Sequence, residues 1–131
     1  MENFGKLVLR LSIGGLMLFH GIHKLIHGFT MIGEMLVKNH LPRELMWGVP
    51  AGEVLAPLML ILGWKARPAA ALIVFTMGMS IYLVFRDKLL TLDSLGAPVY
   101  ELNLLYLFGA IAIMFLGAGK YSVSGGQGKL D

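Results

Sequence analysis

The sequence contains no cysteine and has few charged residues. The absence of cysteine excludes disulfide bonds, thiol redox relays, covalently attached c-type haem and cysteine-held iron–sulfur clusters. Charged residues make up 15% of the 131 positions, whereas an average soluble domain has about 25%. Apolar residues make up 56%, and the mean hydropathy is +0.73. These values indicate an integral membrane protein.

Four apolar segments of about 20 residues are each long enough to cross a ~30 Å hydrocarbon core as a helix. They cover residues 7–26, 45–64, 68–85 and 99–116. None of them has the charged outer stripe that a helix of a soluble bundle presents to water. The sequence therefore predicts an all-α membrane protein, a single domain over residues 1–131 folded as a four-transmembrane-helix bundle.

Two further segments lie outside these spans. Between the first and second spans, residues 28–44 have apolar and charged residues on opposite helical faces, which predicts a short interfacial helix stopped by Pro42. We expect it to cover one mouth of the bundle. Residues 117–131 are rich in glycine and serine, so we expect a flexible tail.

The net charge of +3 does not indicate nucleic-acid binding, because the basic residues are scattered between the apolar spans. In a membrane protein such residues report topology, since positive charges favour the cytoplasmic side. The tight Lys65-Ala66-Arg67 turn predicts that the N- and C-termini both face the cytoplasm.

The first span is unusual because it carries several ionisable residues. Arg10, His20, His23 and Lys24 lie within it, and His27 follows directly. A charged side chain at mid-membrane costs roughly 2.5–3.5 kcal/mol on insertion scales, so each needs a partner, a water-lined cavity or a function. The histidines and the lysine share one helical face, which we expect to point into the bundle.

Depth counting at 1.5 Å per residue suggests the partners. His20 lies at the level of Glu53 in the second span, and Lys24 lies at the level of Glu101 in the fourth. Asn103 lies one turn or less beyond Glu101. We therefore predict two pairs, His20–Glu53 and Lys24–Glu101, around a polar pocket in the outer half of the bundle.

The same residues carry a resemblance to a known family. The opening RLSIGGLMLFHGIHKL is similar to the first-helix signature of the DoxX family, as are Gly52-Glu53, the stretch from Gly63 to Arg67, ELNLLY from Glu101, and GAGKYS from Gly117. The resemblance covers nearly the whole chain. Carried over by position, the motif residues are Arg10, His20, Lys24, Glu53 and Glu101, whereas His23 and His27 are not part of the pattern.

The resemblance implies a four-helix protein of the bacterial inner membrane. Some members are linked to quinone-dependent oxidoreductases, notably the DoxD subunit of a thiosulfate:quinone oxidoreductase, and others to redox-stress complexes with soluble partners. Our hypothesis is a pocket for quinone, quinol or a similar amphiphile that acts in quinone-linked redox chemistry. Whether the chain catalyses a reaction by itself is left open.

In this hypothesis His20 and Glu53 are the catalytic proton donor and acceptor, because histidine titrates near neutral pH and buried glutamate holds a proton more readily. Arg10, Lys24, Glu101 and Asn103 are the ligand-binding residues. No resident cofactor and no metal are assigned; quinone is the expected ligand. The expected partners are the lipid bilayer and an oxidoreductase protein or a second copy of the chain, and nucleic acid is not expected.

Four alternatives stay open at this point. In the first, the two pairs only hold the helices together. In the second, His20, His23 and His27 bind a metal ion with Glu53, since the spacing of the histidines puts them on one helical face. In the third, the protein moves a small amphiphile across the membrane. In the fourth, the chain is a non-catalytic anchor or assembly subunit of an oxidoreductase or stress-response complex.

Overall fold

A computed structural model describes all residues 1–131, and the chain is helical with no β-strand. The first helix, α1, spans Glu2–His27, and a short helix, α2, spans Thr30–Lys38. The last helix, α6, spans Glu101–Leu116. Between α2 and α6 lie two long helices, each of which combines α-helical, 3₁₀-helical and π-helical segments.

The second long helix runs over Arg43–Leu62 and the third over Ala66–Lys88. The second consists of η1 (Arg43–Trp47), α3 (Gly48–Pro50), η2 (Ala51–Leu55) and α4 (Ala56–Leu62). The third consists of α5 (Ala66–Ser80), η3 (Ile81–Phe85) and η4 (Arg86–Lys88).

Helix α1 and these two long helices are long and apolar enough to cross a membrane, whereas α6 is a shorter apolar helix of 16 residues. The predicted all-α membrane fold is thus confirmed, with a short helix, α2, where the interfacial helix is expected. Helix α2 ends at Lys38, before Pro42, and the side-chain amide of Asn39 donates to the Met35 carbonyl at its end.

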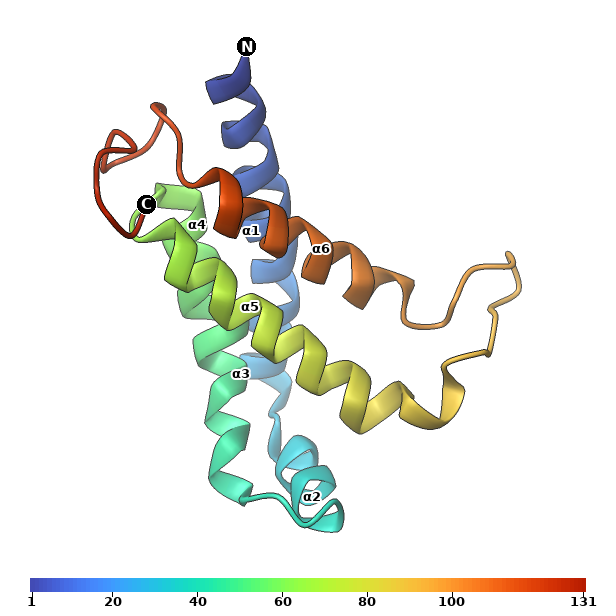
Figure 1. Cartoon of the computed structure of the whole chain (residues 1–131). Coiled ribbons are helices and arrows are strands. Elements are labelled where there is room, and N and C mark those ends of the chain that lie inside the picture. Colours follow the sequence, from blue (N-terminus) through green and yellow to red (C-terminus); the bar gives the residue numbers. More distant parts are fainter.

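The helices pack as two pairs. Figure 1 shows α1 alongside the green helix that contains α4, while α5 and α6 lie side by side and run obliquely across them. Helix α2 lies at the end of the bundle where α1 finishes. The opposite end holds the start of α1 and the C-terminal tail, and the Asn3 side chain accepts a hydrogen bond of 3.0 Å from the Lys120 backbone N–H. Both termini therefore lie at one end; the compartment that this end faces stays a prediction.

Prolines and glycines set the shape of the second long helix. A proline has no N–H, so Pro57 cannot make the hydrogen bond to the carbonyl four residues before it. The turn just before Pro57 is wider than an α-turn, and the Ala56 N–H donates to Ala51, five residues back. The helix ends at Gly63, whose φ of 70° is the left-handed conformation that glycine adopts without strain.

Small residues let the helices approach closely. A Cβ added at Gly21 would overlap the Glu53 carbonyl oxygen, and one at Gly52 would overlap the Thr76 hydroxyl. Alanines line the buried face of α5, where Ala66, Ala69 and Ala70 are almost completely buried. Without a hydrophobic force between helices in lipid, such close van der Waals packing is what holds them together.

The tail, residues 117–131, folds back over the end of the second long helix. The Val123 N–H donates to the Leu62 carbonyl, and the Ser124 hydroxyl donates to the Gly63 carbonyl. The Asp131 carboxylate accepts from the Lys65 backbone N–H at 2.8 Å. The expected flexibility of this tail concerns motion and stays a prediction; the structure describes it with defined contacts.

Candidate functional site

The face of α1 that points into the bundle differs from the predicted polar face. The buried residues of α1 are Arg10, Gly14, Met17 and Gly21, which recur every three or four positions. Lys24 continues this line and is half-buried, whereas His20, His23 and His27 are exposed. The expectation that the histidines point into the bundle is therefore wrong for His23 and His27, whereas His20, although exposed, packs against Tyr106 of α6. Backbone packing decides the orientation, because only the glycine side lets the second long helix come close.

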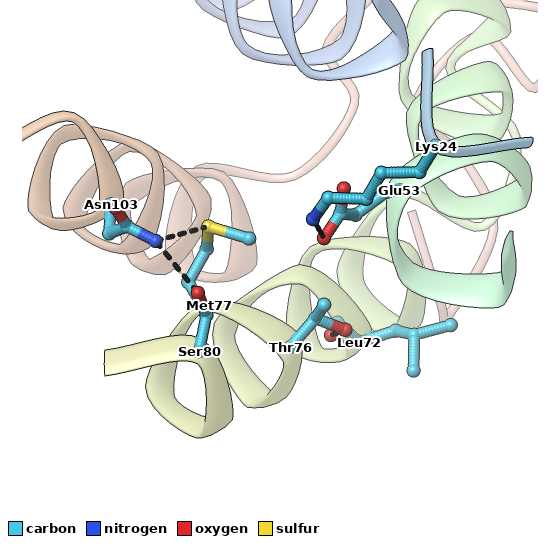
Figure 2. Close-up of polar contacts among 7 residues, drawn as sticks. All are labelled: Lys24, Glu53, Leu72, Thr76, Met77, Ser80 and Asn103. Atoms are coloured by element: carbon cyan, nitrogen blue, oxygen red, sulfur yellow. Dashed lines mark hydrogen bonds and ion pairs between the residues drawn. The ribbon is translucent and has the colours of Figure 1, made fainter. Parts of the chain in front are cut away.

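The central polar contact of the bundle is an ion pair between Lys24 and Glu53. The Lys24 Nζ lies 2.7 Å from Glu53 Oε1, and the Lys24 and Glu53 side chains are 34% and 3% exposed. Figure 2 shows this pair between α1 and the second long helix. The predicted pairs His20–Glu53 and Lys24–Glu101 are thus wrong.

The exposed Glu101 starts α6 and makes no ion pair. Depth counting failed there because it treated the helices as parallel, whereas α5 and α6 run obliquely (Figure 1).

Glu53 sits where the helix backbone departs from regular α-geometry. It is the middle residue of η2, the widened turn that precedes Pro57. Such π-turns recur at functional sites. The buried Oε2 atom of its carboxylate has no hydrogen-bond partner within the protein. A buried carboxylate oxygen without a partner is costly, so it marks a place where a ligand group or water completes the site.

A large cavity opens beside the ion pair. Its volume is about 310 Å³, and it lies between α2, the second long helix and the third. Most of its wall is apolar, formed by Phe, Met, Leu, Ile and Val side chains. Its polar side chains are Lys24, Glu53, Thr76 and Ser80. The shape is that of a small-molecule site: an apolar slot with a few polar groups.

A smaller cavity of about 80 Å³ lies against the same ion pair. Lys24, Glu53 and Ser80 line both cavities, while His20, Asn103 and Tyr106 line only the small one. The His20 ring packs edge-on against the Tyr106 ring with centroids 5.8 Å apart.

The Asn103 amide donates to the Ser80 hydroxyl at 3.0 Å and lies 3.9 Å from the Met77 sulfur (Figure 2). Of the predicted site residues, the structure therefore brings His20, Lys24, Glu53 and Asn103 together.

Arg10 lies apart from this group. Its side chain is completely buried, and the guanidinium donates to the Leu60 carbonyl oxygen at 3.0 Å and to the Tyr121 carbonyl oxygen. It lines neither cavity. Of the four predicted ligand-binding residues, the structure thus separates Arg10 and Glu101 from Lys24 and Asn103. Arg10 fastens the tail to the C-terminal carbonyls of the second long helix, where a cation is favoured by the helix dipole.

The three histidines of α1 do not converge. His23 stacks on His27 with ring centroids 4.1 Å apart, and both are exposed. His20 faces Tyr106 on α6. No group of three or more histidine, aspartate or glutamate side chains is arranged to hold a metal ion.

Sequence reasoning missed several residues of the site. Thr76 and Ser80 line the large cavity, and α2 supplies much of its apolar wall. A signal for the hydroxyls was present, because Thr76 and Ser80 stand four residues apart in an otherwise apolar span and so share a helical face. Tyr106 ends the ELNLLY stretch that carries the family resemblance, but nothing else in the sequence singles it out, because an aromatic residue in a membrane helix is ordinary.

Comparison with known proteins gives one match. The DoxX family model matches residues 5–86, well over half of the chain. This stretch includes nearly all of α1, all of α2 and the second long helix, and nearly all of the third, and with them Lys24 and Glu53. Helix α6 and the tail lie beyond the matched residues. No curated protein and no solved structure matches the chain.

Proposed function

The chain belongs to the DoxX family of membrane proteins, and from that premise we propose that the large cavity binds a quinone, a quinol or a similar amphiphile. In this proposal the protein takes part in quinone-linked redox chemistry at the bacterial inner membrane. The electrons are exchanged with a partner oxidoreductase. The chain supplies the groups that hold the ligand and accept its proton.

The observation that carries this proposal is the unpartnered Oε2 of Glu53 at the wall of an apolar cavity. A quinol hydroxyl is a donor that Oε2 can accept. The Lys24 ammonium has three N–H donors, of which one is directed at Glu53 Oε1. The others are available to a quinone carbonyl oxygen. The pair can therefore satisfy both redox forms of the ligand head group.

The apolar wall suits the remainder of such a ligand. Helix α2 and the third long helix contribute Met31, Met35 and Met79, whose flexible side chains adapt to ligands of different shape. A cavity of about 310 Å³ is at the lower end of the usual range for small-molecule sites. It accommodates a substituted ring, while a long isoprenoid tail extends from the cavity into the lipid.

The test is binding of a quinol analogue to the purified protein in lipid nanodiscs. We expect Glu53→Gln to weaken binding roughly 10- to 100-fold, because a hydrogen bond to a charged group contributes about 1.5–3 kcal/mol. Glu101→Gln is the matched control, since Glu101 is exposed and lines neither cavity. An alkylbenzene that lacks both oxygens should bind weakly to all three proteins. Equal quinol affinity of folded Glu53→Gln and wild type would remove Glu53 from the site.

A second candidate function, a membrane anchor for a soluble protein, is favoured by the loop of residues 89–100. This loop projects from the bundle (Figure 1) and holds Leu90 and Leu95, which are 97% and 91% exposed. The Asp93 carboxylate fixes the loop by accepting from the Leu95 and Ala97 backbone N–H groups. Purification in mild detergent tests this candidate: a stoichiometric oxidoreductase lost on Leu90→Ser and Leu95→Ser supports it, and a lone homo-oligomer contradicts it.

A further inference from the structure

The Lys24–Glu53 pair separates two cavities of different character. On one side lies the large, mainly apolar cavity; on the other lies the small cavity, whose wall includes His20, Asn103 and Ser80. Lys24 and Glu53 belong to both walls. The Glu53 carboxylate is therefore accessible from an apolar compartment and from a polar one, although it is only 3% exposed on the outer surface of the protein.

The small cavity suits water better than an organic ligand. Its volume of about 80 Å³ gives room for at least two water molecules at roughly 30 Å³ each. A buried water needs two to four polar partners, and an imidazole, an amide, a hydroxyl, an ammonium group and a carboxylate line this cavity. The exposed His20 stands at its wall, so the cavity lies next to the surface of the bundle beside His20.

We propose that the small cavity is a water-filled passage that carries protons between Glu53 and the surface of the bundle beside His20. The passage replaces the direct His20–Glu53 contact that the sequence predicts. Its proton-carrying role rests on the proposed function, because the bound ligand supplies the proton. The hydration of the passage does not depend on that ligand.

The proposed proton step is a transfer from the ligand to Glu53 and then to water. A ligand hydroxyl in the large cavity loses its proton to Glu53 Oε2, so an O–H bond breaks on the ligand and one forms on the carboxyl group. The electron pair stays on the ligand oxygen, which the Lys24 ammonium faces. Glu53 then passes the proton to water in the passage and on to the His20 imidazole or to bulk water.

The groups that face Glu53 are consistent with this route. Helix α1 supplies Lys24 and His20, and α6 supplies Tyr106. Of the third long helix, Thr76 and Ser80 line a cavity with Glu53, and neither hydroxyl is ionised at neutral pH. His20 is thus the imidazole along the small cavity that can accept a proton from the passage.

Hydration is tested by the reaction of Ag⁺ with substituted cysteines in proteoliposomes, which has no thiol background because the chain has no cysteine. Met77→Cys lies on the small cavity and is 4% exposed; Ile73→Cys, one turn away on the same helix, is fully buried and lines neither cavity. We expect Ag⁺ to modify Met77→Cys at least tenfold faster. The same comparison is made on α6 between Asn103→Cys, on the small cavity, and Phe108→Cys, on the exposed face of the helix. We expect Ag⁺ to modify Asn103→Cys faster. Equal rates within both comparisons overturn the passage.

The proton role is tested with a hydroquinone ligand and a pH-sensitive dye in weakly buffered solution. We expect Asn103→Leu, which makes the small cavity less polar, to slow proton release on ligand binding at least tenfold. Unchanged release overturns the proton role. If the wild type binds no hydroquinone, the proposed function and the proton role fail together, while the Ag⁺ rates still decide whether the passage is hydrated.

Discussion

The Lys24–Glu53 ion pair should respond asymmetrically when its partners are removed one at a time. Lys24→Met leaves a carboxylate that is 3% exposed and has no other partner, so we expect a loss near the upper end of the ~3–5 kcal/mol measured for broken buried pairs. Glu53→Leu leaves an ammonium group that is 34% exposed on a flexible stem. This group can extend toward the membrane surface, so the loss should fall below that range.

The double variant Lys24→Met/Glu53→Leu separates the ion pair from other effects of the two substitutions. Neither charge remains, and two apolar side chains of similar volume occupy the site, so the free energy of unfolding should lie closer to that of the wild type than either single variant does. The measurement is reversible unfolding in mixed micelles with increasing sodium dodecyl sulfate, followed by circular dichroism. If the double variant loses the sum of the two single losses, or if Glu53→Leu loses more than Lys24→Met, the reasoning is refuted.

Two further predictions follow from the packing of α1. Gly21→Val places a side chain against the Glu53 backbone and should cost about 1–3 kcal/mol. Gly15→Ala is the control, because a Cβ at Gly15 meets nothing within 4 Å, and it should change the free energy of unfolding by less than about 0.5 kcal/mol. Arg10→Met removes the donor to two backbone carbonyls and should release the tail, so hydrogen exchange at the Val123 amide should accelerate at least tenfold; an unchanged rate would show that other contacts hold the tail.

The membrane fold follows from the sequence because it depends on the length and the hydropathy of each segment, which are sums over neighbouring residues. An apolar segment of about 20 residues becomes a helix in lipid, since every backbone polar group must be paired there. The four apolar helices therefore appear within a few residues of their expected bounds. The break between Leu62 and Ala66 is likewise determined by local sequence, because Gly63 adopts a left-handed conformation that ends the helix.

For the candidate site, the sequence indicated which residues gather better than which of them pair. Ionisable residues in a membrane helix stand out by type alone, and this identified His20, Lys24 and Glu53 without any structure. Their pairing depends on the rotation and inclination of each helix. The glycines of α1 turn Lys24 toward Glu53, and the oblique course of α6 leaves Glu101 exposed at the helix start.

By itself, the sequence determined that this is a helical membrane protein and that its first helix carries charges in need of partners. Those conclusions rest on hydropathy, length and residue type, which are properties of single segments. Only the tertiary structure decided that Lys24 pairs with Glu53, that Arg10 holds the tail, and that two cavities meet at one carboxylate. The physical reason is that small residues set how closely helices approach, and this distance decides which side chains meet.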